Sequence, residues 1–207
     1  MTTGLHGYPI DAPDPTPRVL WLGSRVISAS VVIFFSAFVF SFAYLKAQNS
    51  HGRWNPGLEV SVMFASVILG AALLSALAFG MGVRRLRDDD TSEWQGWAAI
   101  ALLFVFGLIG LHVWQLNTLP FTPTQGGYAS VFVGWTVALI AVELGALYWL
   151  FSVLRGTLRV VGEIDPYDED SPPHVRHLVA SARGYWFFWR VVAAAEIIAY
   201  VLLVLVR

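Results

Sequence analysis

Four charged side chains lie inside long apolar stretches of the sequence, namely Arg25, Glu143, Arg190 and Glu196. A charge in hydrocarbon surroundings costs about 3 kcal/mol or more, so such groups are usually paired or functional. Both arginines lie near the ends of their stretches, where a long side chain can extend toward the polar boundary. Two arrangements of the carboxyls stay open. Glu143 pairs with Arg190, within the chain or against a neighbouring subunit, or Glu143 and Glu196 are both protonated and hydrogen-bonded to backbone or hydroxyl groups.

Histidines and cysteines offer little further chemistry. Of the five histidines only His112 lies within an apolar stretch, and a bis-histidine haem site needs two. His174 and His177 have a spacing that could bind a metal ion, but the sequence indicates no third ligand. The chain has no cysteine, and no phosphate-binding loop, nucleophile elbow or HExxH motif is present. We therefore expect no catalytic residue, no directly bound cofactor and no metal ligand.

The elements that carry these groups are long and apolar. The chain has 207 residues, of which 57% are hydrophobic and only 13% charged, and its mean hydropathy is +0.63. About 20 helical residues cross a bilayer core. The sequence therefore predicts an all-α membrane protein with five transmembrane helices, at about residues 20–45, 58–83, 94–116, 128–154 and 185–206.

Basic residues in the connecting segments predict the orientation. Five crossings place residues 1–19, an extended tail, on the same side as the loops at 84–93 and 155–184. That side would hold eight basic residues, Arg18, Arg84, Arg85, Arg87, Arg155, Arg159, Arg176 and Arg183, against Lys46, Arg53 and Arg207 on the other. Basic loops stay cytoplasmic, which predicts an inside N-terminus and an outside C-terminus.

The loop at 155–184 is acidic between residues 163 and 170, and is either solvated or docked on a basic partner. Its two prolines, Pro172 and Pro173, predict the end of any helix that extends beyond the membrane. The net charge of the whole chain is −1, which offers no attraction to nucleic acid.

Two stretches of the sequence share motifs with a known family. The outside loop PFTPTQGGYASVF resembles the pattern PF-T-x-x-x-G-x-Y-G-S-x-F-F of subunit III of the haem–copper, cytochrome c oxidase-type, terminal oxidases. Matching residues are Pro120, Phe121, Thr122, Tyr128, Ser130 and Phe132, and Thr136 matches the threonine with which the family pattern continues into the next helix. The start of the last helix, YWFFWRVV, resembles the family motif Y-W-H-F-V-D-V-V through Tyr185, Trp186, Phe188, Val191 and Val192. A looser likeness covers the first helix, so the resemblance extends over nearly the whole chain.

The chain departs from the family at its polar positions. The two family histidines of the fourth helix correspond to Leu139 and Val142, and the histidine and aspartate of the last motif correspond to Phe187 and Arg190. The acidic residue of the family's first helix corresponds to Val31 or Val32. Groups that the family links to proton uptake and lipid contact are thus absent at these positions.

The resemblance implies a divergent, five-helix bacterial form of subunit III in the bacterial or archaeal plasma membrane. Such a subunit would stabilise the catalytic subunit and hold phospholipid. Haem and copper would belong to the partner, together with oxygen reduction and proton translocation. A scaffold or assembly subunit of another membrane redox complex, such as nitric oxide reductase, is the alternative. A small transporter fits less well, because no internal repeat is visible.

Overall fold

The computed structural model describes residues 16–49, 54–87, 91–158 and 173–206, and these residues are almost entirely helical. Five long helices follow one another: α1 (Thr16–Ala47), α2 (Val62–Arg87), α3 (Thr91–Asn117), α4 (Gly127–Leu158) and α5 (Pro173–Tyr200). A 3₁₀ turn, η1 (Pro123–Gln125), precedes α4, and a π-helical segment, η2 (Val201–Val206), continues α5. Each helix is long and apolar enough to cross a membrane, as the sequence predicts.

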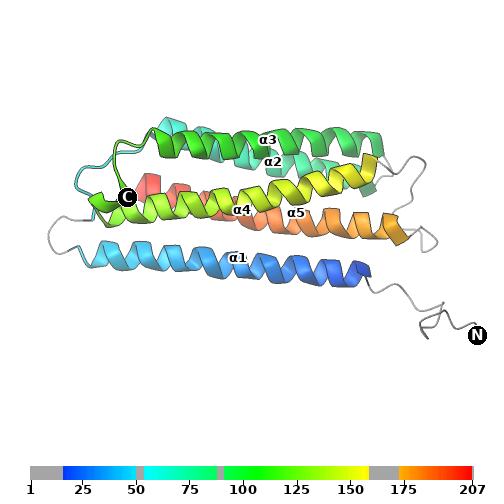
Figure 1. Ribbon diagram of the computed structural model, residues 1–207, viewed down its shortest axis with the longest axis horizontal. Helices are drawn as coiled ribbons and strands as arrows, with labels where there is room; N and C mark the ends of the chain where they lie inside the picture. Colours follow the sequence, from blue (N-terminus) through cyan, green and yellow to red (C-terminus); the bar gives the residue numbers. More distant parts are fainter. Residues whose placement is uncertain (1–15, 50–53, 88–90, 159–172, 207) are drawn as a thin grey trace, which may run out of the picture.

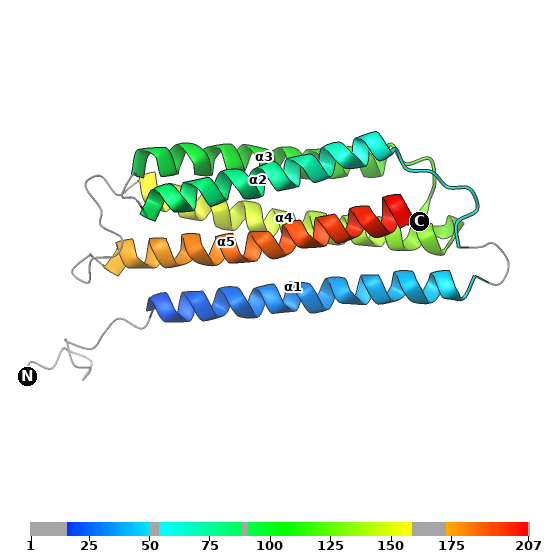
Figure 2. The same cartoon turned by 180° about the vertical axis from the view of Figure 1, so that it is seen from behind.

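The helices lie side by side in one elongated bundle (Figures 1 and 2). In both views α1 forms one edge, α2 and α3 form the other, and α4 and α5 lie between them. The α2 helix packs mainly on α3, and α1 packs mainly on α5. The α4 helix contacts α1, α3 and α5. Any group that points inward from α3, α4 and α5 is therefore brought to a common interior.

The outer surface of the bundle is apolar. Large hydrophobic side chains on every helix are strongly exposed, among them Met63 (81%), Tyr148 (75%), Ile33 (72%), Leu103 (70%) and Phe106 (69%). Apolar exposure on this scale marks a surface that contacts lipid or another protein. The surface and the helix lengths together indicate a multi-pass membrane protein.

The last helix differs from the sequence prediction. It begins at Pro173 rather than near residue 185, so the second half of the predicted loop at 155–184 is helical. Proline lacks an N–H and has a helical φ, which suits the first position of a helix. Here Pro173 begins a helix instead of ending one. The first helix also begins earlier, at Thr16, and residues 1–15 and 159–172, with the acidic segment, lie outside the described residues.

Close approach of α2 and α5 depends on Gly80. A Cβ atom placed on Gly80 would lie 2.7 Å from the Trp186 ring. Such a contact forces the ring or the helix to move. A Cβ atom placed on Gly70, on the same helix, would have no such neighbour within 4 Å. A small residue is thus required on the side of α2 that packs against α5.

We expect Gly80→Val to lower the free energy of unfolding by about 1–3 kcal/mol, because it overpacks this contact. Unfolding of the purified protein in mixed detergent and dodecyl sulfate micelles measures the change. Gly70→Val is the matched control and is expected to have little effect. Equal effects of the two substitutions would show that the contact with Trp186 does not limit the approach of the helices.

Candidate functional site

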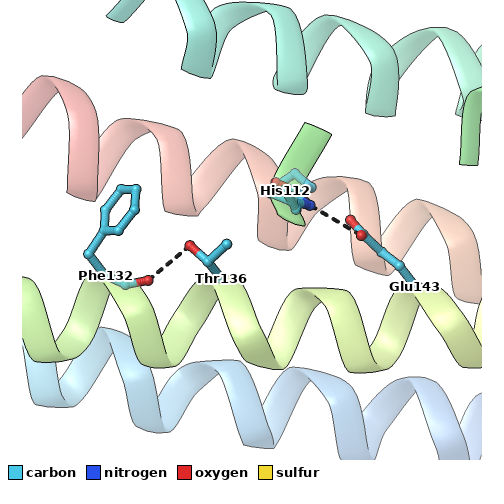
Figure 3. A network of polar contacts seen from close by, with 5 residues as sticks. His112, Phe132, Thr136 and Glu143 are labelled. Carbon is cyan, nitrogen blue, oxygen red and sulfur yellow. Dashed lines mark hydrogen bonds and ion pairs between the residues drawn. The ribbon is translucent and has the colours of Figure 1, made fainter. Parts of the chain in front are cut away.

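Three titratable side chains meet inside the bundle, one from each of three helices. His112 comes from α3, Glu143 from near the middle of α4, and Glu196 from α5. The Nδ1 atom of His112 lies 3.1 Å from Oε2 of Glu143, within hydrogen-bond distance, and Nε2 lies 3.7 Å from Oε1 of Glu196. Figure 3 shows the side chains of His112 and Glu143 pointing toward one another. Each ring nitrogen of His112 thus has a carboxyl group near it.

The cluster is almost completely buried. The side chains of His112, Glu143 and Glu196 are 3%, 0% and 4% exposed. Among the described residues, no lysine or arginine forms an ion pair with any of the three. Two carboxylates without a lysine or arginine partner are unfavourable in such surroundings unless protons or a cation compensate their charge. The chemistry available here is the binding of a positive species.

A small pocket adjoins the cluster. It has a volume of about 40 Å³ and is lined in part by His112, Glu196, Gln115, Thr136 and Tyr200. A cavity of this size has room for a water molecule or an ion. The Oε1 atoms of Glu143 and Glu196 have no hydrogen-bond partner, although they are buried. Unsatisfied carboxyl oxygens and a small, mostly apolar pocket beside Glu196 together leave room for a further species.

The predicted pairing of Glu143 with Arg190 is wrong within the chain. Glu143 contacts His112, whereas Arg190 is exposed and its guanidinium lies over the rings of Trp186, at 5.2 Å, and Phe187, at 5.7 Å. Position 190 precedes Glu196 by six residues on a helix of about 3.6 residues per turn, so the two side chains leave α5 on different faces. Arg25 is likewise exposed, 4.7 Å from the Trp21 ring.

His112 is the member of the cluster that sequence reasoning missed. As the single histidine in an apolar span it cannot form a bis-histidine haem site, and its spacing in the sequence does not predict the contact with Glu143. The available signal was simpler: His112, Glu143 and Glu196 stand in three different spans, and each would be costly alone in lipid. Because each of these groups is costly in contact with lipid, the three are expected to meet at one site inside the bundle. The sequence predicts no metal ligand in this chain, whereas these three side chains together could hold a metal ion.

Residues of the first family motif build the end of the bundle where α4 begins. The Tyr128 hydroxyl donates a hydrogen bond to the Leu203 carbonyl at 2.6 Å, and its N–H donates to the Trp54 carbonyl at 2.9 Å. Its ring packs between those of Trp54 and Phe121, and the ring of Phe132 packs against both Tyr128 and Phe121. This aromatic group connects the segment between α1 and α2, and the loop before α4, to the segment that continues α5.

The polar residues of the same motif fix the turn itself. Ser130 donates a hydrogen bond to the Pro123 carbonyl at 2.6 Å, and the Thr122 N–H donates to the Gln125 side chain at 2.8 Å. Gly126 has a φ of 150° and a ψ of 172°, a conformation essentially limited to glycine. Pro120 is exposed, and the buried Thr136 hydroxyl donates to the Phe132 carbonyl within its own helix. The motif therefore has a structural role here.

The second motif packs at the opposite end. Tyr185 is fully buried, stacks on Trp189 and meets the ring of Phe79 at a centroid distance of 4.6 Å. Trp186 is partly buried and reaches α2 at Gly80. These contacts connect α5 with α2, as Tyr128 connects α4 with the end of α5.

Tyr128→Phe removes one hydroxyl and leaves the Leu203 carbonyl without its side-chain donor. We expect the free energy of unfolding to fall by about 1–2 kcal/mol, the usual effect of one lost buried hydrogen bond. The same micelle-based unfolding assay measures it. Tyr148→Phe is the control, because Tyr148 is 75% exposed. If Tyr128→Phe were as harmless as the control, the bond to Leu203 would contribute nothing to stability.

No protein-family model matches this sequence, and no curated protein matches it either.

Proposed function

We propose that this protein is a non-catalytic accessory subunit of a haem–copper respiratory oxidase, related in form to subunit III. The observation that carries the proposal is the placement of the motif residues. Tyr128 and Phe121 organise one end of the bundle, and Tyr185 and Trp186 organise the other. Residues that match the family pattern thus coincide with the contacts that define the bundle. The likeness therefore lies in the scaffold and not in the polar interior.

Its role would be to stabilise the catalytic subunit in aerobic electron transport. The partner would carry haem and copper and perform the redox chemistry. The apolar exterior, with Phe106, Leu103 and Tyr148 strongly exposed, supports contact with other membrane-spanning subunits. The excess of basic residues in the segments on the N-terminal side supports an inside N-terminus and an outside C-terminus in a bacterial or archaeal plasma membrane.

A groove between α1 and α5 supports the holding of lipid. Its volume is about 380 Å³, and apolar side chains such as Val31, Phe35 and Ile198 line most of it. Arg190 is the one charged residue among its lining residues. Acyl chains suit the apolar wall, and a lipid phosphate suits an arginine. Phospholipid is thus the ligand expected here, with no haem or copper held by this chain.

Deletion of this chain from its source organism tests the proposal. Cyanide-sensitive oxygen uptake and the haem content of isolated membranes are expected to fall, since the catalytic subunit loses a stabilising partner. A plasmid copy carrying the wild-type sequence should restore both quantities. Glu93→Gln should restore them equally well, because Glu93 is half-exposed and lies outside the packed clusters. Unchanged oxygen uptake and haem content in the deletion strain would contradict the proposal.

A further inference from the structure

The His112, Glu143 and Glu196 cluster has the composition of a metal site. Each residue offers one potential ligand atom, a nitrogen or a carboxylate oxygen, and these atoms all lie within 4.8 Å of one another. We propose that His112, Glu143 and Glu196 bind one divalent cation, best matched by Zn²⁺, that joins α3, α4 and α5 within the membrane.

The spacing of the donor atoms is compatible with three ligands of one ion. The 3.7 Å between Nε2 of His112 and Oε1 of Glu196 exceeds the usual hydrogen-bond range of about 2.7–3.2 Å. Two atoms that each lie about 2.1 Å from a zinc ion are about 3.4 Å apart at the tetrahedral angle. Only one ring nitrogen of His112 can bind the ion, and the atoms that the three residues offer to it all lie within 4.8 Å of one another. Small side-chain rotations bring the set to ligand geometry.

The unpartnered carboxylate oxygens are an independent sign of an occupant. Glu143 Oε1 and Glu196 Oε1 are buried and have no hydrogen-bond partner, so rotation toward an ion breaks no existing bond. These two oxygens are free to act as ligands.

Charge balance favours a divalent ion. Two carboxylates and a neutral imidazole carry two negative charges, and one divalent cation neutralises them. Within the described parts of the chain, no arginine or lysine forms an ion pair that could provide this compensation. The neutral site that results is compatible with its position inside the bundle.

The donor set and the pocket narrow the choice of ion. One imidazole nitrogen and two carboxylate oxygens suit a borderline ion such as Zn²⁺ better than the all-oxygen cage that Ca²⁺ prefers. Three protein ligands leave a fourth position open. The adjoining pocket of about 40 Å³, beside Gln115 and Tyr200, has room for a water molecule there.

The test uses the full chain, purified in mild detergent with any subunits that accompany it, stripped with a chelator and titrated with Zn²⁺. The bound metal is measured after equilibrium dialysis. Wild type is expected to bind about one more ion per chain than His112→Gln, Glu143→Gln or Glu196→Gln, each of which should weaken Zn²⁺ binding at this site at least about tenfold. Glu93→Gln, on α3 but half-exposed, is the matched control and should bind as wild type does.

A second measurement needs no variant. Zn²⁺ that binds only the folded protein should raise the thermal midpoint of the stripped wild type, and the rise should grow with zinc concentration. The midpoint of Glu196→Gln should not respond. The proposal is overturned if stripped wild type takes up no more Zn²⁺ than the three glutamine variants, or if zinc leaves its midpoint unchanged. Either result would mean that protons alone neutralise the two carboxyls.

Discussion

His112→Leu is expected to lower the free energy of unfolding by about 3–5 kcal/mol, because among the described residues it removes the only ion-pair partner of the two buried carboxyls. Leucine fills a similar volume but offers no nitrogen to Glu143 or Glu196, each of which lies near one ring nitrogen of the imidazole. The equilibrium unfolding of the purified protein in mixed micelles provides the measurement.

The matched variant combines His112→Leu with Glu143→Gln and Glu196→Gln. Removing both charges should recover most of the lost stability, since neutral groups of similar shape need no counter-charge. A loss below about 1 kcal/mol for His112→Leu alone would show that the imidazole does not stabilise the carboxyls. Equal losses in the single and triple variants would attribute the effect to packing.

Trp135→Ala is the second large effect that we expect, at about 3–5 kcal/mol. Trp135 on α4 is fully buried and packs against two rings of α1, those of Phe35 and Phe38, at centroid distances of 5.7 Å and 5.6 Å. Alanine would leave a cavity at the contact between α1 and α4. Because α1 otherwise packs mainly on α5, its attachment should weaken most.

Trp114→Ala is the matched control, because the side chain of Trp114 is 62% exposed. It removes the same number of atoms but leaves no interior cavity. Unfolding in micelles and limited proteolysis of the segment that follows α1 report stability and the attachment of α1. Similar losses for the two variants would contradict the role of Trp135 as the interior contact between α1 and α4.

The five helices are predictable from the sequence, because a bilayer-length apolar run has few other structures available to it. The start of the last helix is not predictable in this way, because a proline pair such as Pro172 and Pro173 is compatible with the end of one helix and with the beginning of the next. The packing of residues after Pro173, such as the buried Val175 and Val179, determines that a helix begins here.

The site was predictable only in part. Glu143 and Glu196 stand out as acids in apolar spans, but their partner depends on how each helix is rotated about its axis. Lipid-facing and interior faces are both apolar here, so the sequence pattern carries little information about rotation. The sequence therefore suggests Arg190 as the partner of Glu143. In the structure, the Arg190 guanidinium lies over the Trp186 ring, and His112 contacts Glu143 instead.

The most direct test of the proposed role is the absorption spectrum of the protein purified through a tag on this chain. After extraction in mild detergent, the eluate is reduced with dithionite, and the reduced-minus-oxidised difference spectrum is recorded. We expect the absorbance of haem a or haem o, in constant ratio to the tagged chain. A tagged chain that elutes alone and without haem absorbance would contradict the oxidase assignment, and haem b or haem c alone would indicate another redox complex.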